Sequence, residues 1–534
     1  MKEKNYHTLH YMTHSDSSLH NNAIWRAAVM GIFALMMSSC HDAWNEHYGT
    51  TGKQSSSSNT LWDEIASRPE LNEFRSLLEQ TGCRDALDSD QMFTVFAPKG
   101  SIRSTAGSTE ALINEVVYNH VARFPLSASN RLGVARSVRM LNGKVGTFEA
   151  NGDRYTFAGK ALTESNIICR NGVLHVIEGQ IPFFCNVWEY MDQDTTYSCI
   201  RDYLYSFNAI RLDEDASVAG AVVDGQITYV DSVVINTNEM FYRIGQLNSE
   251  DSTYWMVLPT NRAWRDAYER VSSYYCYSAK NPQRDSLQNH YTQQAMVSDL
   301  VFSRSMQLMP ADALISTCCH TFPNPLQTLL PEYVGFDHGI ECSNGTVFPV
   351  DTLRHAPWLS WHSPIKVEAE NQRGREYTLC ELYKRSLSAS SPYFELVSDA
   401  SYIETVPTTS SANPSIIFTI PDVLSASYDI KAVFLPQTLG IDKSNYGRPN
   451  KLICNLTTVD ANGKSITDKS EVLCTDPTAI DTVTLFKGYT FDACNYDEES
   501  VTTKLKIISQ VTSRERADYS RTLLIDCILF EPAK

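Results

Sequence analysis

One order of segments occurs twice along this chain, and it constrains the fold more than any other feature. In the first copy a helix beginning at Leu61-Trp62 precedes a strand, Phe93–Pro98, and an Asn-Gly turn opens a last strand, Asn171–Ile177. Between the two strands, apolar residues three and four positions apart predict a helix whose apolar face includes His120. Helices and strands that alternate within one short stretch are typical of an α+β domain with its own core.

The second copy is longer and less regular than the first. Trp188, the strand Tyr254–Pro259 and the turn at Asn344-Gly345 follow in the same order, and the stretch Asp213–Asp251 carries insertions. Modules repeated in tandem usually present surfaces to partners. The repetition therefore predicts two similar domains that act through their outer faces.

The repeated strands resemble the signatures of a known family. Phe93–Pro98 is similar to the first signature of fasciclin-like domains, and Asn171–Ile177 is similar to the second. Tyr118 and His120 stand where that family carries a Tyr-His pair, with one residue inserted between them. The resemblance implies a first fasciclin-like domain over residues 61–184 and a divergent second one over residues 185–360.

Two interpretations of Tyr118 and His120 stay open at this point. In the family the Tyr-His region is implicated in adhesion, so the resemblance makes both residues candidates for an adhesion motif. The position of His120 on the apolar face of its predicted helix favours instead a core histidine with a satisfied hydrogen bond.

From residue 361 to residue 534 the pattern changes to short β-rich segments separated by turn residues. Seven or eight such segments predict a β-sandwich. The stretch Ser415–Pro436 resembles a C-terminal module that follows fasciclin-like domains in lipoproteins of glycan-foraging Gram-negative bacteria. The expected fold class is therefore multidomain, with two α+β fasciclin-like domains followed by an all-β sandwich.

The first sixty residues indicate export. Arg26 precedes the apolar run Ala27–Met37, and small residues lead to Cys40, which is the pattern of a secretory signal over residues 1–39. Met37–Cys40 resembles the lipobox of bacterial lipoproteins, which implies cleavage before Cys40, lipidation of its thiol and a flexible tether over residues 40–60. The expected location is the outer membrane, lipid-anchored, at the cell surface or on the periplasmic face.

Charge and cysteine spacing exclude several classes of protein. With 45 basic and 62 acidic residues the net charge is −17, which argues against sequence-independent binding of nucleic acid.

Fourteen cysteines occur at irregular spacings, and Cys318-Cys319-His320 has no second ligand pair at zinc-site spacing. Buried thiols or occasional disulfides explain this pattern better than a metal site, so we expect neither a metal nor a cofactor.

No catalytic motif stands out. The chain contains no GxSxG, HExxH or GxxxxGK[ST] sequence. Carboxylate runs such as Asp213–Asp215 and Glu498-Glu499 are typical of solvated loops, and glycoside hydrolysis needs two carboxylates placed across a cleft, which sequence does not show. We therefore predict that the protein is not an enzyme.

The leading hypothesis is a lipid-anchored envelope protein with an adhesion or scaffold role, whose partner is an envelope protein or a polysaccharide. A second hypothesis is a surface glycan-binding lipoprotein that assists an outer-membrane polysaccharide uptake system, and a third is a cryptic glycan hydrolase. After Trp361 the chain contains no Trp, so stacking on sugars would depend on tyrosines. The candidate stacking residues are Tyr393, Tyr402, Tyr446, Tyr489 and Tyr496. Ligand and oligomeric state remain open.

Overall fold

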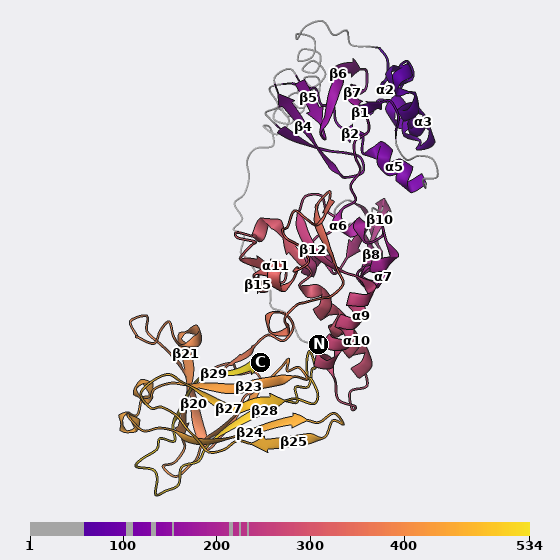
Figure 1. The fold of residues 1–534 in the computed structure, drawn as a ribbon. Coiled ribbons are helices and arrows are strands. Elements are labelled where there is room, and N and C mark those ends of the chain that lie inside the picture. Colours follow the sequence, from indigo (N-terminus) through magenta and orange to yellow (C-terminus); the bar gives the residue numbers. More distant parts are fainter. Residues whose placement is uncertain are drawn as a thin grey trace. The chain divides into compact units, whose positions relative to one another are not determined.

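The structure is a computed structural model, and its described residues are 58–102, 110–129, 135–151, 154–212, 217–223, 226–231 and 234–533. The predicted signal, Cys40 and nearly all of the tether lie outside these residues. Among the described residues no helix is long and apolar enough to cross a membrane. The chain divides into two compact units, one ending at Phe183 and the other beginning at Phe184, and each is described by itself (Figure 1).

The first unit begins with short helices that pack on a sheet. Thr60 caps the first of them, because its hydroxyl accepts the N–H of Asp63 while the Asp63 carboxylate accepts the N–H of Thr60. Leu61, Trp62 and Ile65 of this helix are buried in the core. The helices of the unit are α2 (Leu61–Ala66), α3 (Asn72–Gln80), α4 (Cys83–Asp88) and α5 (Glu110–Tyr118).

In the described part of the first unit, the sheet has seven strands in the order β2-β1-β7-β6-β5-β4-β3. The strands β1 and β7 are parallel, with Phe93 opposite Gly172. At that pair the backbones are so close that a Cβ on Gly172 would lie 2.0 Å from the Phe93 carbonyl oxygen. The strands are β1 (Phe93–Lys99), β2 (Val121–Arg123), β3 (Ala135–Arg139), β4 (Val145–Asn151), β5 (Arg154–Phe157), β6 (Lys160–Cys169) and β7 (Gly172–Glu178).

The α+β part of the second unit repeats this strand pairing. The strands β12 and β17 are parallel, Tyr254 lies opposite Gly345, and a Cβ on Gly345 would lie 2.1 Å from the Tyr254 carbonyl oxygen. Their sheet has the order β13-β12-β17-β16. Its strands are β12 (Tyr254–Pro259), β13 (Val301–Ser303), β16 (Ile340–Cys342) and β17 (Gly345–Val350).

Helices and three small two-stranded sheets complete this part of the second unit. The helices are α6 (Val187–Tyr190), α7 (Ser198–Tyr205), α8 (Phe241–Ile244), α9 (Asn261–Ser272), α10 (Arg284–Ser298) and α11 (Pro325–Thr328). Among the described residues, three strand pairs stand apart from the four-stranded sheet. One pair lies wholly within the predicted insertion Asp213–Asp251, and another has one strand inside the insertion and one just before it. They are β8 (Asn208–Leu212) with β11 (Val234–Asn238), β9 (Val218–Val223) with β10 (Gln226–Asp231), and β14 (Ala313–Ile315) with β15 (Thr321–Pro323).

Residues 361–533, which we call the β region, form two antiparallel sheets of six strands. The first has the order β20-β21-β29-β23-β27, with β18 paired to β29. The second has the order β19-β22-β28-β24-β25, with β26 paired to β24. The prediction of β-rich segments is confirmed, and one apolar core contains residues of both sheets, among them Ile403, Tyr428, Leu452 and Ile507.

The strands of the first sheet are β18 (Ile365–Glu368), β20 (Cys380–Ser386), β21 (Ser401–Pro407), β23 (Ser427–Phe434), β27 (Asp481–Thr490) and β29 (Leu523–Pro532). Those of the second are β19 (Glu376–Thr378), β22 (Ser415–Thr419), β24 (Lys451–Val459), β25 (Ser465–Lys469), β26 (Leu473–Cys474) and β28 (Lys504–Ser509). Short 3-10 turns connect them, including η8 (Gln437–Leu439) and η9 (Lys443–Asn445).

The β region and the α+β part of the second unit share a continuous apolar core. Backbone and side-chain hydrogen bonds join them as well. The N–H of Cys494 donates to the Cys276 carbonyl oxygen at 2.8 Å, and the Tyr277 hydroxyl donates to the Tyr496 carbonyl oxygen at 2.9 Å. The domain boundaries proposed from the sequence stay predictions.

Candidate functional site

Tyr118 is the last residue of α5, and His120 lies in the turn that follows, not within the helix as the sequence pattern predicted. His120 is 1% exposed, its Nδ1–H donates to the Val116 carbonyl oxygen at 2.7 Å, and its Nε2 accepts the N–H of Ile181 at 3.0 Å. Burial lowers the pKa of His120 to about 4, so the ring is neutral at pH 7. This placement favours a structural role for His120, while an adhesive role for the half-buried Tyr118 stays a prediction.

The five tyrosines predicted as candidates for stacking on sugars are scattered over the β region. Tyr402 is 4% exposed and its hydroxyl donates to the Leu439 carbonyl oxygen at 2.9 Å. Tyr489 and Tyr496 pack edge-on against neighbouring rings, and Tyr393 packs against a small apolar cluster. Tyr446 is 41% exposed and stands on the loop that leads to Arg448.

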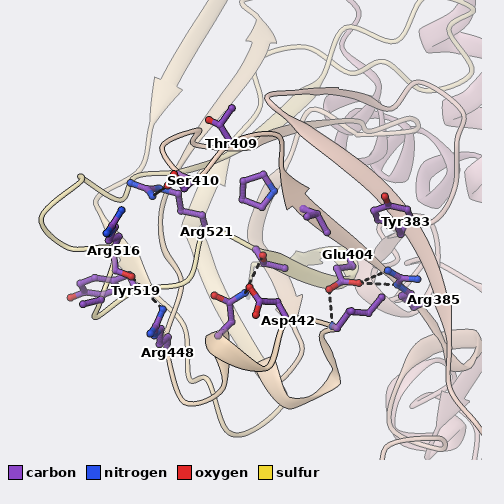
Figure 2. A pocket seen from close by; sticks show the side chains of 16 residues that line it. Tyr383, Arg385, Glu404, Thr409, Ser410, Asp442, Arg448, Arg516, Tyr519 and Arg521 are labelled. Carbon is purple, nitrogen blue, oxygen red and sulfur yellow. Dashed lines mark hydrogen bonds and ion pairs between the residues drawn. The ribbon is translucent and has the colours of Figure 1, made fainter.

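A groove of about 820 Å³ opens in the β region, and none of those five tyrosines lines it. Its walls come from β20, β21 and three loops: the one after β21, the one that carries η8 and η9, and the one between β28 and β29 (Figure 2). This volume is in the range of sites that bind small molecules or a few sugar units. Tyr383 and Tyr519 provide its aromatic surface.

An ion pair between Arg385 and Glu404 forms one end of the groove. Glu404 on β21 is 1% exposed, and Nε and Nη2 of Arg385 on β20 both lie 2.8 Å from its Oε2. The backbone N–H of Ile441 donates to Oε1 of Glu404 at 3.0 Å. These contacts tie the loop that carries η8 and η9 to the sheet. Tyr402, on the same face of β21 as Glu404, holds this loop as well, because its hydroxyl donates to the Leu439 carbonyl oxygen.

The other end of the groove is rich in arginine. Arg521 is 8% exposed, and its guanidinium donates to neutral acceptors: Asn413 Oδ1 at 3.0 Å, the Val511 carbonyl oxygen at 2.8 Å, and the Ser410 carbonyl oxygen. Figure 2 shows Arg448, Arg516 and Tyr519 gathered at this end, away from Arg385 and Glu404. Nη1 of Arg448 donates to the Arg516 carbonyl oxygen at 3.4 Å.

Carboxylates are few in the lining of the groove. Of the described residues that line it, two carry carboxylates, Glu404 and Asp442. Hydrogen bonds from the hydroxyl and N–H of Ser444 lower the pKa of Asp442, and Glu404 is held by Arg385. Glycoside hydrolysis needs a carboxylic acid that still carries its proton near neutral pH, and the lowered pKa of Asp442 does not meet that need.

A second hollow, of about 840 Å³, lies between β18, β19 and the loop 497–501. Its lining is mainly charged and includes no aromatic side chain among the described residues. Because sugar recognition in proteins draws on aromatic faces, the groove with Tyr383 and Tyr519 is the stronger candidate.

A cluster of acidic residues lies where β18 pairs with β29. Ligand atoms of Glu368, Asp526 and Cys527 are within 4.8 Å of one another, and Glu368 lies opposite Cys527 in the pairing. The buried Oε2 atoms of Glu368 and Glu370 have no hydrogen-bond partner. Burial raises the pKa of Asp526 to about 6, and the charges of Glu368 and Glu370 add to this. Two carboxylates at this distance could hold a hard cation such as Ca²⁺, although the thiol is a poor ligand for it and the Lys366 ammonium already lies 2.7 Å from Oε1 of Glu368.

Sequence reasoning expected no metal and did not single out Tyr383 or Tyr519. The acidic cluster joins positions about 160 residues apart in sequence, so it has no local spacing motif. For Tyr383 the available signal was its alternation with apolar Leu382 on β20, which marks an outward-facing aromatic.

Comparisons with known proteins agree with part of the sequence analysis. A family model for the fasciclin domain matches residues 69–181, which confirms the resemblance of the first copy. No curated protein matches the chain.

Several solved structures are similar to the chain. A FAS1 domain pair from the insect cell adhesion molecule fasciclin I is 11% identical, with 54% of this chain and 98% of that chain covered and a TM-score of 0.20. A CBM22-1 xylan-binding domain from Paenibacillus barcinonensis is 13% identical, with 32% and 95% covered and a TM-score of 0.21. An exo-β-1,3-galactanase from Phanerochaete chrysosporium is 11% identical, with 32% and 29% covered and a TM-score of 0.18. At these TM-scores the likenesses carry no argument about function.

Proposed function

We propose that this chain is a non-enzymatic, adhesion-type protein of the bacterial cell envelope that binds a polysaccharide in the groove of its β region. The groove itself carries this proposal, because it combines two tyrosine rings with polar side chains in a hollow of suitable size. The fasciclin domain matched at residues 69–181 supports an adhesion-type role.

The lining of the groove matches the chemistry of sugars. A sugar ring has an apolar face of C–H groups and an edge of hydroxyl groups. Tyr383 is 38% exposed and can stack on such a face, as can the half-buried Tyr519, whose ring lies 5.7 Å from the ammonium of Lys451. Thr409 and Asn445 line the same groove and can exchange hydrogen bonds with sugar hydroxyls.

The envelope location rests on the sequence. Lipidation of Cys40 would place the folded units on the outer membrane at the end of a tether, where a polysaccharide or an uptake complex is within reach. Labelling cells with a fatty acid and substituting Cys40→Ala tests this part separately. Loss of the label and release of the protein from membranes support the anchor, whereas an unlabelled wild-type protein contradicts it.

Affinity electrophoresis of the chain without its leader, on a panel of polysaccharides, tests the binding function. We expect at least one glycan to retard the protein, and Tyr519→Ala and Tyr383→Ala to reduce the retardation several-fold. Tyr377→Ala is the matched control, because Tyr377 is 50% exposed in the same region but lies outside the groove. Absence of retardation by every glycan contradicts binding, and turnover of any glycan contradicts a non-enzymatic role.

A further inference from the structure

We infer that the groove selects glycans that carry anionic groups, either carboxylates or sulfates. This inference rests on the proposed glycan-binding function and adds the chemical class of the ligand. Four arginines and two carboxylates line the groove, although the chain as a whole has a net charge of −17. A local excess of positive charge on an acidic protein is the opposite of what random placement predicts, and it attracts anions to that place.

The excess is concentrated at one end of the groove. Arg385 and Glu404 neutralise each other at the other end through their ion pair. Among the described residues, no ion pair joins Arg448, Arg516 or Arg521 to a carboxylate. The remaining acid of the lining, Asp442, accepts the N–H of Ser444 at 2.9 Å and attracts Arg448 without forming an ion pair with it, so it offsets part of this charge.

Arg521 is the strongest single indication. The residue is 8% exposed in the groove wall, and among the described residues its guanidinium donates to neutral oxygens, those of Asn413, Ser410 and Val511. A buried charge without a counter-ion is costly, because neutral hydrogen bonds replace only part of its hydration. An anionic group bound in the groove would supply the missing negative charge and lower that cost.

Arg448 and Arg516 offer the direct contacts. Arg448 is half-buried and donates to the Arg516 backbone, which keeps the two residues together beside Tyr519. A guanidinium presents a planar fork that matches the two oxygens of a carboxylate or sulfate. A sugar ring stacked on Tyr519 would therefore hold its anionic substituent against Arg448 and Arg516.

Pairs of ligands that differ only in charge test this inference. Polygalacturonate and its methyl ester share one backbone, and dextran sulfate and dextran share another. We expect the acidic member of at least one pair to bind ten-fold or more tightly than its neutral partner, and its affinity to fall between 50 and 300 mM salt because surface charges are screened. The pair that shows the difference identifies carboxylate or sulfate as the recognised group.

Arginine variants link the effect to the groove. The double variant Arg448→Ala/Arg516→Ala should lose ten-fold or more in affinity for the acidic glycan, while Arg514→Ala should bind as the wild type does. Arg514 is exposed on the same loop but does not line the groove, so Arg514→Ala removes one positive charge close to the groove without changing its lining. Circular dichroism of each variant checks that the fold is retained.

Each failure has a distinct meaning. If neutral glycans bind as tightly as acidic ones and the double variant keeps its affinity, the anionic class is wrong and glycan binding stands. If no glycan of either kind binds, the proposed function itself is wrong. If polyglutamate or single-stranded DNA binds as tightly as the acidic glycans and Tyr519→Ala has no effect, the groove recognises charge alone and the inference is overturned.

Discussion

Asn344 makes in the second unit the same three hydrogen bonds that Asn171 makes in the first. Oδ1 of Asn171 accepts the N–H of Leu61 at 2.8 Å, and its Nδ2 donates to the carbonyl oxygens of Leu87 and Ser89, both at 2.7 Å. The buried amide therefore joins the start of the first helix to the segment before β1. It does so from the turn that opens the last strand.

Asn344 repeats this arrangement at the turn before β17. Its Oδ1 accepts the N–H of Val187 at 2.8 Å, and its Nδ2 donates to the carbonyl oxygens of Leu247 and Ser249 at 2.8 and 2.9 Å. Both asparagine side chains are at most 1% exposed. The Asn-Gly turn is thus a structural element of each α+β core.

Replacing this amide should destabilise the protein. Asn171→Ala leaves one N–H and two carbonyl groups of the buried backbone without a partner, which we expect to cost about 3 kcal/mol. Urea unfolding of the full chain without its leader measures the change, and Asn462→Ala, at an exposed turn, is the control. A loss below about 1 kcal/mol contradicts the role assigned to Asn171.

The glycine after the asparagine should tolerate no side chain. Gly172→Ala would place a Cβ 2.0 Å from the Phe93 carbonyl oxygen and push β1 and β7 apart. We expect a loss of more than about 2 kcal/mol by urea unfolding. Gly179→Ala is the matched control, because Gly179 has a φ of +78° but nothing within 4 Å of an added Cβ. If both variants lose the same stability, backbone conformation rather than steric contact explains the loss.

Acid should weaken the first unit through two buried histidines. Burial lowers the pKa of His120 and of His175 to about 4, below the usual 6.5 of an unfolded histidine. The contribution of these neutral rings to the free energy of unfolding is therefore fully present above pH 6.5. It falls as the pH decreases towards 4, by about 3 kcal/mol for each ring. Hydrogen exchange of peptides over β1 and β7, corrected for intrinsic rates, should show faster opening at pH 5 than at pH 7. Equal protection at both pH values contradicts this prediction.

The contribution of Asp526 to stability should have the opposite pH dependence, decreasing as the pH rises. Because the pKa of Asp526 is raised to about 6 from 3.8, its stabilising contribution is present below pH 4 and is lost as the pH rises through 6. Asp526→Asn should therefore be about 2 kcal/mol more stable than the wild type at pH 8 in the presence of a chelator. At pH 4 this advantage should disappear. Urea unfolding at the two pH values measures both effects.

Calcium should reverse the effect of the same substitution. Binding of Ca²⁺ to Glu368 and Asp526, in competition with the Lys366 ammonium, would compensate the repulsion between the two carboxylates and stabilise their ionised forms. After dialysis against EDTA, millimolar CaCl₂ should raise the melting temperature of the wild type by several degrees and leave Asp526→Asn unchanged. An equal response of the two proteins, or none, argues against a cation site.

Local patterns were sufficient to place the strands of the repeated part. The expected strand Phe93–Pro98 is β1 (Phe93–Lys99), and the Asn-Gly turn opens β7 at Gly172. The helix expected around His120 is α5, which ends two residues before it. These elements follow from apolar periodicity and turn residues, which act over a few positions and are visible without the rest of the chain.

The candidate site was less predictable. Composition indicated that tyrosines would replace tryptophan in the β region, but the candidate Tyr402 is buried in a small apolar cluster, whereas Tyr383 and Tyr519 line the groove. Whether a tyrosine is covered or open depends on which loops pass over its face of the sheet. Those loops come from parts of the chain 20 to more than 100 residues away from Tyr383, so residue spacing within a strand does not reveal which tyrosines are covered.

The sequence by itself determined the order of helices and strands, the asparagine and glycine at each turn, and the acidic charge of the chain, because these properties depend on residue type and short-range spacing. The tertiary structure alone decided that Arg448, Arg516 and Arg521 meet beside Tyr519, and that carboxylates on β18 and β29 meet at one place. The physical reason is that electrostatic and packing interactions act over a few ångströms in space, whereas the groups involved are far apart along the chain.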